Sequence, residues 1–369
     1  MANNLDAAAL AVRSAYPKNR IMLDDKGLPS VMVFIPKFQL YEVMGGGEVE
    51  THPAFIVNGK EIDGFWIGKY ETKHINGRAY SLPGEAPSYD GRRTDFENYA
   101  EAKGKGWHEV TAAEWAAVAL WCHRNNCEPK GNGYDYNNTT RPWGEAIPAS
   151  EFSKNTLVVK TGTGPLTWSH NKQLDGIWDM CGNEYEWLTG IRFVYGEVQV
   201  LENNNAADSR NDRSDSSANW KAIRGSDGAY ITPDGNGTTS GSIKLNKIIT
   251  GNIQYDTDTT QNGQFSAPFK DIVYRSSTIG IAARRKLIAL GLLPDTTLTA
   301  TNGVDASYGY NETAEDTFWV DTSLPIARVM RGGSCQHKYS HIFALFGYLA
   351  ESENKKDIGG RVAYVELPD

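Results

Sequence analysis

Cys335, His337 and His341, near the C-terminus, come nearest to a chemical site by residue type and spacing. A thiol and two imidazoles are ligands for transition metals. No carboxylate that would orient the histidines is evident, and metal-binding histidines normally have such a partner. Ser334 with His337 offers a hydroxyl nucleophile and a base, although turning of the backbone also explains a serine after two glycines. We therefore interpret both groups as polar side chains on a surface.

The remaining cysteines give a second candidate site. Cys122 and Cys127 flank His123, which suggests zinc, but their spacing matches no standard pair of zinc ligands and no second pair exists. A chain of 369 residues buries a core without disulfide bonds. We expect all four cysteines, including Cys181 and Cys335, to be reduced thiols that pack in the structure.

Composition excludes several classes of protein. The chain is 40% hydrophobic and 22% charged, as is ordinary for globular proteins. A net charge of −8 without a stripe of Lys and Arg argues against nucleic-acid binding. No segment has the length of a membrane span, so we expect no membrane insertion. The first residues lack the basic and apolar regions of a signal peptide. Synthesis in the cytoplasm, with exposure on a virion, fits that pattern.

The elements that would position these residues alternate without a βαβ rhythm, which predicts a loop-rich α+β fold. Thr111 and Glu114 have capping-box spacing and start the clearest helix, with Trp115 and Val118 facing the core. Residues 203–262 read as a folded insertion with short strands. Other expected elements are helices at 4–16 and 279–292, a hairpin at 20–40, and strands at 65–70 and 243–249.

Three segments taken together resemble a known family. They are residues 108–115 (HEVTAAEW), 176–187 (GIWDMCGNEYEW) and 331–334 (RGGS), the last followed by 358–361 (IGGR). In this order they resemble the C-type lectin fold of the formylglycine-generating enzyme family. Within that group the chain is most similar to the variable proteins of diversity-generating retroelements. The matching parts are residues 196–200, 220–223, 290–294, 331–334 and 343–345, with Ala350, Ser352, Ile358, Gly359 and Arg361.

The resemblance implies a division of the chain. Residues 1–30 would form an N-terminal helix and hairpin segment, and 31–369 a C-type-lectin-like domain. That domain would hold an insertion at about 190–325 and a variable region at about 331–361. In such proteins the variable region contacts the ligand, and phage members on tail fibres determine which host surface is bound.

The physical character of the variable region agrees with that role. Phe343, Leu345, Ala350 and Ile358 are spaced to anchor the segment to a core. Between them lie aromatic, amide and charged groups, as in a paratope. The predicted ligand-binding, variable residues are Cys335, Gln336, His337, Lys338, Tyr339, Ser340, His341, Phe346, Tyr348, Leu349, Glu353, Asn354, Lys355 and Asp357.

The resemblance also implies a cation site. In the enzyme family, the segment that matches Asp179, Gly182, Glu184 and Glu186 supplies calcium ligands, and hard oxygen donors suit that ion. The alternative is that Asn183 and Glu186 hydrogen-bond the turn. Calcium would be structural, and no cofactor is required for the expected function.

Enzymes of the family bind copper through two cysteines after Gly-Gly-Ser, whereas this segment has Cys335 alone. Related sequences also have Trp in place of Cys335 and Phe in place of Gly360. We therefore expect no catalysis but a receptor-binding, host-tropism protein of a phage tail fibre. Its partner would be a protein or glycan of the host cell surface, and it would form a homotrimer on the virion. The alternatives are an enzyme of the formylglycine-generating type and a purely structural virion component.

Overall fold

The computed structural model describes residues 4–46, 49–89, 91–133, 142–153, 156–248, 251–258, 263–296, 316–337, 341–353 and 355–368. The predicted α+β class is confirmed, because a few helices accompany many short strands and long irregular segments. No helix in these ranges is both long and apolar enough to cross a membrane. The helices are α1 (Asn4–Ala15), α2 (Arg93–Glu101), α3 (Ala112–Arg124) and α4 (Ile281–Ala289).

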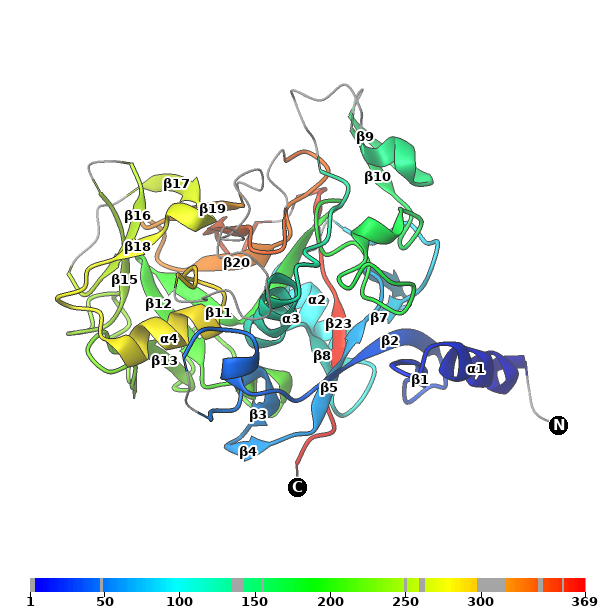
Figure 1. Cartoon of the computed structure of the whole chain (residues 1–369), viewed down its shortest axis with the longest axis horizontal. Coiled ribbons are helices and arrows are strands. Elements are labelled where there is room, and N and C mark those ends of the chain that lie inside the picture. The colour runs from blue at the N-terminus through cyan, green and yellow to red at the C-terminus, as the bar shows by residue number, and fades with distance from the viewer. Residues whose placement is uncertain are drawn as a thin grey trace.

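One sheet joins the two ends of the chain (Figure 1). Its strand order is β1 (Asn19–Leu23), β2 (Pro29–Pro36), β5 (Gly64–Gly68), β23 (Val362–Tyr364) and β8 (Trp107–Glu109). The hairpin expected at 20–40 is confirmed as β1 and β2, which pair antiparallel. Strand β23, from the C-terminus, lies antiparallel between β5 and β8. The residues that follow the variable region are therefore held by the N-terminal part of the chain.

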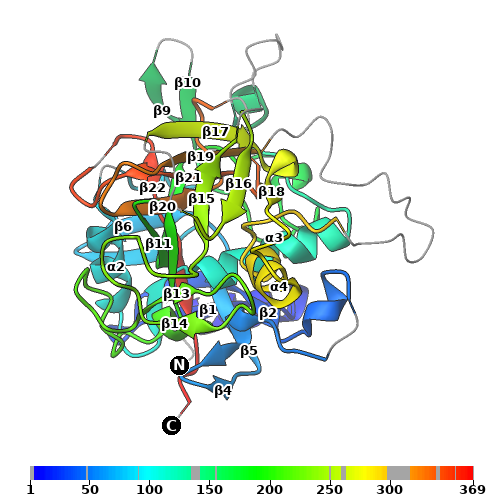
Figure 2. The same cartoon turned by 90° about the vertical axis from the view of Figure 1, so that its left-hand side faces the viewer.

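The larger sheet carries the variable region. Its main order is β17 (Gln264–Pro268), β19 (Thr317–Asp321), β21 (Leu345–Leu349), β20 (Ala327–Arg331), β11 (Tyr185–Val194), β12 (Glu197–Leu201), β15 (Lys244–Lys247), β16 (Ile253–Asp256) and β18 (Val273–Tyr274). Strands β13 (Trp220–Ile223) and β14 (Tyr230–Ile231) extend from β12, and β22 (Ile358–Gly359) lies parallel to β11. The strands of the insertion thus continue the sheet that holds the variable region (Figure 2). Separate hairpins are β3 (Ile56–Val57) with β4 (Lys60–Glu61), β6 (Thr72–Ile75) with β7 (Arg78–Ser81), and β9 (Pro148–Ser153) with β10 (Thr156–Val159).

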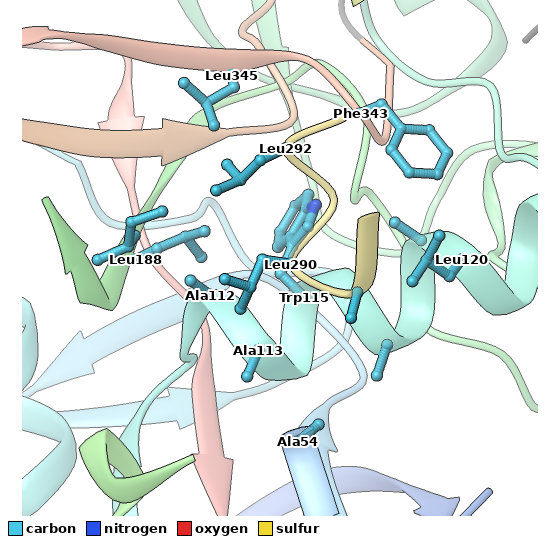
Figure 3. Close-up of a cluster of buried hydrophobic side chains, with 14 of the residues drawn as sticks. Ala54, Ala112, Ala113, Trp115, Leu120, Leu188, Leu290, Leu292, Phe343 and Leu345 are labelled. Atoms are coloured by element: carbon cyan, nitrogen blue, oxygen red, sulfur yellow. The ribbon is translucent and has the colours of Figure 1, made fainter. Parts of the chain in front are cut away.

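Helix α3 lies at the centre of the core. The predicted capping box is confirmed: Glu114 N donates to Thr111 Oγ1, and Thr111 N donates to the Glu114 carboxylate, each over 3.1 Å. Trp115 is fully buried, and its indole N–H donates to the carbonyl of Ile342 over 2.8 Å. In the view of Figure 3, Trp115 lies between Leu292 and Phe343. The helix therefore holds the chain just before β21.

Two expected elements are shorter than the sequence pattern indicated. The helix expected at 279–292 covers only α4, because Gly291 takes a left-handed φ of 62° just after the Leu290 cap. The strand expected at 243–249 covers only β15, which pairs with β16 as an antiparallel hairpin.

Candidate ligand-recognition site

The variable region begins at a tight glycine turn after β20. Gly332 and Gly333 have φ values of 81° and 75°, a conformation that glycine adopts without strain. A Cβ atom on Gly332 would lie 2.8 Å from the carbonyl oxygen of Met180. The Gly332 carbonyl also accepts a hydrogen bond from Gly182 N over 2.8 Å. The turn is thus packed against segment 176–187, and no larger residue fits there.

Four of the predicted ligand-binding side chains point into the protein. Cys335, Phe346, Leu349 and Asp357 are 3%, 0%, 4% and 7% exposed, respectively. Phe346 packs in a cluster that includes Tyr185, and the ring centroids lie 4.6 Å apart. Side chains buried in this way support the segment and are not available to a ligand at the surface. The structure therefore corrects the expectation that these four side chains lie at the surface and contact the ligand.

A second set of side chains does reach solvent. Glu353 and Lys355 are exposed, and Gln336, His337 and Tyr348 are half-buried. The ring of Tyr348 stacks on Trp319 with centroids 5.0 Å apart, and the Lys355 ammonium lies 5.1 Å from the Tyr348 ring centre. These contacts join an aromatic pair to the loop after β21. We define the recognition surface as Trp319, Gln336, His337, Tyr348, Glu353 and Lys355.

Trp319 is a member of this surface that sequence analysis missed. It lies on β19, which pairs in parallel with β21 and places Trp319 opposite Phe346. In the structure Phe318 and Val320 are buried and Trp319 between them is half-buried, the period-2 pattern of a strand with one open face. In the sequence all three residues are apolar, so the alternation is not visible there. Its position beside Tyr348 follows only from the pairing of strands distant in sequence, and no local pattern reveals that.

A polar network of Tyr185, Ser334 and Asp357 holds the His337 ring in place. The Tyr185 hydroxyl lies 2.8 Å from His337 Nε2, and Ser334 Oγ lies 3.2 Å from His337 Nδ1. Ser334 Oγ donates a hydrogen bond to Asp357 Oδ2 over 2.9 Å. The hydroxyl proton therefore points to the carboxylate and not to the imidazole, whereas a serine nucleophile must give its proton to its base. The arrangement braces His337 and does not form a catalytic triad.

An ionic anchor fixes the loop that leads from β21 to β22. The carboxylate of Glu351 lies 3.2 Å from Arg93 Nε on α2 and 2.5 Å from Arg328 Nε on β20. Both arginine side chains are almost completely buried, at 4% and 2% exposure. Because one carboxylate bridges two buried guanidinium groups, Glu351 holds this end of the loop, while Asp357 holds the other through Ser334.

His341 is half-buried and differs from His337 in its surroundings. Burial lowers the pKa of both His341 and His337, but the charged groups that act on the two rings differ. Glu128 and Lys130 act on His341, whereas Asp357 and Lys355 act on His337. The two histidines therefore have different charged neighbours. Lys338, Tyr339, Ser340 and Asn354 lie outside the described residues.

Some of the oxygen donors predicted to bind calcium already have other partners in the structure. Both carboxylate oxygens of Glu186 bind Arg361, over 2.6 and 2.8 Å, and Asp179 Oδ2 accepts from Gly162 N. The backbone N–H of Gly182 donates a hydrogen bond to the carbonyl of Gly332 in the glycine turn. Within the described ranges, no three His, Cys, Asp or Glu side chains are placed to share a metal ion. The Arg361 guanidinium supplies the positive charge beside Glu186, where the family resemblance implies calcium.

Asn183 organises the turn instead. Its side-chain oxygen accepts from Val159 N over 2.8 Å, and its Nδ2 donates to the Glu71 carboxylate over 2.6 Å. Glu184 is 1% exposed, and among the described residues neither of its carboxylate oxygens has a hydrogen-bond partner. Burial, and then the neighbouring Glu186 carboxylate, raises the pKa of Glu184. The alternative to a calcium site was that Asn183 and Glu186 hydrogen-bond the turn; the Asn183 bonds are found, whereas Glu186 binds Arg361 instead.

Gly360 stands where related sequences have phenylalanine, and the structure shows what lies beside it. A Cβ atom on Gly360 would lie 2.8 Å from the ring of Phe96 and 2.1 Å from Glu109 Oε1. Phe96, on α2, is fully buried. A phenylalanine from a different element therefore occupies space beside Gly360, the position at which related sequences carry a phenylalanine of their own.

Comparison with known proteins gives solved structures only. PvdO from Pseudomonas aeruginosa is 14% identical over 93% of this chain and 97% of that chain, with a TM-score of 0.35. Treponema denticola variable protein 1 is 11% identical over 94% and 98%, with a TM-score of 0.34. The Major Tropism Determinant P3c variant is 11% identical over 94% and 71%, with a TM-score of 0.28. No protein-family model and no curated protein matches the chain. With TM-scores below 0.5, none of these similarities bears on the function of this chain.

Proposed function

We propose that this protein is a non-catalytic binding protein that recognises its ligand through the recognition surface. The observation that supports this most strongly is the division of residues 335–357 into a buried set and a solvent-facing set. Trp319 and Tyr348 offer a flat aromatic pair, and tryptophan and tyrosine dominate the energetic centres of binding interfaces. His337, Gln336 and Lys355 add adaptable hydrogen-bonding and charged groups beside that pair.

A more specific proposal concerns where the protein acts. We infer a receptor-binding protein of a phage tail fibre, whose surface varies through a retroelement and whose ligand is a protein or glycan of the host cell. A homotrimer on the virion is the assembly that we expect. The codons of His337 and Tyr348 are reachable from an Asn codon by change at adenines, as the diversification mechanism requires.

Sequencing tests the variable character directly. The neighbouring DNA should hold a reverse transcriptase gene and a near-identical template repeat that differs only at adenines. Copies from one population should differ at solvent-facing positions such as 336, 337 and 348, and much less at Phe346. Identical copies throughout 335–357, without a template repeat, would favour a structural virion component.

A binding assay tests the surface. Tyr348→Ala should weaken binding of the purified protein to host cells by about 30-fold, because an aromatic anchor contributes about 2 kcal/mol. Tyr41→Ala is the matched control, since Tyr41 is an exposed tyrosine (46%) outside this surface. Equal binding by the two variants would place the contact surface elsewhere.

Oxidase activity of the formylglycine-generating type is the less favoured alternative. That chemistry needs a pair of thiolates, and Cys335 is the only cysteine of the segment. Burial and the neighbouring Asp357 and Glu184 carboxylates raise the pKa of Cys335, which keeps the thiol protonated. Copper-dependent turnover of a cysteine-containing peptide would overturn this judgement.

A further inference from the structure

A cavity of about 550 Å³ lies between β2, the C-terminal end of α3 and the loop at 170–175. None of its lining residues belongs to the recognition surface. Its volume is within the range of sites that bind small molecules and far exceeds that of one water molecule. Val33, Ile35, Val118 and Trp121 form an apolar wall, and polar side chains line much of the rest.

His170 presents a fixed hydrogen-bond donor at this cavity. The ring is 5% exposed, and its Nδ1 accepts a hydrogen bond from Ile177 N over 2.8 Å. Burial lowers the pKa of His170 to about 3, so the imidazole is neutral and carries its proton on Nε2. Within the described residues no hydrogen bond to Nε2 is found. The ring centroid lies 5.4 Å from that of Trp121, so donor and aromatic surface adjoin.

The cavity also offers an acceptor, and its charges are largely compensated. Asp175 Oδ1 accepts from Asn171 Nδ2 over 2.8 Å, which orients the carboxylate at the cavity. Lys37 is paired with Glu61 over 2.8 Å. The other charged lining residues comprise as many bases as acids, namely Lys18, Arg124, Glu42 and Asp175. With Lys37 neutralised by Glu61, the charges of the lining sum to zero, so the cavity has no excess of one sign to attract an anion or a cation.

We propose that this cavity is a second ligand site and that it binds a saccharide residue. Sugar hydroxyls both accept and donate hydrogen bonds, so they can accept one from the N–H of His170 Nε2 and donate one to the Asp175 carboxylate. The C–H face of the sugar ring is apolar and can pack on Trp121. A saccharide thus matches the donor, the acceptor and the aromatic surface of this cavity.

Saturation-transfer NMR of the full chain tests the proposal. Glucose, galactose, mannose and N-acetylglucosamine would each be added at millimolar concentration, with benzoate as a charged aromatic probe. At least one sugar should bind, and Trp121→Ala should weaken that binding by about tenfold or more. Tyr348→Ala, on the recognition surface, should bind the sugar as wild type does, which separates this site from the proposed receptor-binding function.

Three results would overturn the proposal: no sugar binds, benzoate binds in preference to every sugar, or Trp121→Ala binds sugar as wild type does. If Trp121→Ala does not fold, Asn125→Trp gives an independent test. Asn125 is exposed, lines the cavity and caps α3 with an ordinary φ of −95°, so the fold tolerates a tryptophan that narrows the entrance. Asn125→Trp should also lose the sugar, and unchanged binding by that variant would equally contradict the proposal.

Discussion

Between Cys335 and Asp357 the chain carries two sets of side chains that differ in what they contact. Phe346 is fully buried and is enclosed by aromatic and aliphatic side chains that include residues of β11, β20 and α2. Two residues later, Tyr348 is half-buried and contacts Trp319 and Lys355 of the recognition surface. The exposed Lys355 follows on a loop that is fixed at Glu351.

The difference teaches that buried side chains can fix the backbone of a segment while its solvent-facing side chains are free to be replaced. Buried residues of the segment contact several elements at once, so each replacement disturbs neighbours on all sides. Solvent-facing residues contact few partners, and replacement there changes recognition more than stability. The predictions below test this division, beginning with the largest effect.

Arg361→Leu should destabilise the protein by about 3 to 5 kcal/mol, because it leaves the buried Glu186 carboxylate without its partner. Urea denaturation followed by fluorescence measures the free energy of unfolding. Lys355→Ala is the exposed control and should change it by less than about 0.5 kcal/mol. The double variant Glu186→Gln with Arg361→Leu should recover part of the loss, and no recovery would show that the ion pair is not the cause.

Phe346→Ala should cost about 3 kcal/mol, the usual penalty for removing a buried aromatic ring. Tyr348→Ala, two residues along the same strand, should cost clearly less because Tyr348 is only half-buried. Thermal and chemical unfolding of the two variants gives the comparison. Equal costs would remove the distinction between the buried and solvent-facing sets.

Glu351→Gln should cost about 1 to 2 kcal/mol, because two buried guanidinium groups lose a charged acceptor. The loop between Glu351 and Asp357 should then open more often. Hydrogen exchange of its backbone amides, read by mass spectrometry, should accelerate there and not in α3. Unchanged exchange would mean that Glu351 does not hold the loop.

His337→Asn should have the smallest effect and a pH-dependent one. Burial lowers the pKa of His337 below its ordinary 6.5, so the unfolded chain takes up a proton before the folded one does. Wild type should therefore lose stability relative to His337→Asn as pH falls below about 6.5. NMR titration of the imidazole should give a midpoint below 6.5, and a midpoint above it would contradict the buried setting.

Local chemistry made much of the fold predictable. The capping box at Thr111 and Glu114, the hairpin of β1 and β2, and the left-handed glycines at 332 and 333 each follow from a few adjacent residues. The end of α4 was expected at 291–294 and comes slightly earlier, because Leu290 continues the apolar pattern but already caps the helix before Gly291 turns the backbone.

The candidate site was less predictable because its members come from distant strands. Sequence analysis placed Phe346 and Tyr348 in one class, since both are aromatic and both lie between apolar anchors. Their different burial depends on β19 and β11, which flank β21 and β20 in the sheet. Arg361 likewise lies 175 residues from Glu186, and no spacing rule joins them.

The anchors at Glu351 and Asp357 have a practical consequence. The backbone enters this loop from β21 and leaves it into β22, and both strands are paired within the larger sheet. The side chains of Ser352, Glu353 and Lys355 are exposed, and other residues make the two attachments. A foreign peptide grafted between Glu351 and Asp357 would therefore have both of its ends attached to fixed backbone. This makes the protein a candidate carrier for epitope presentation.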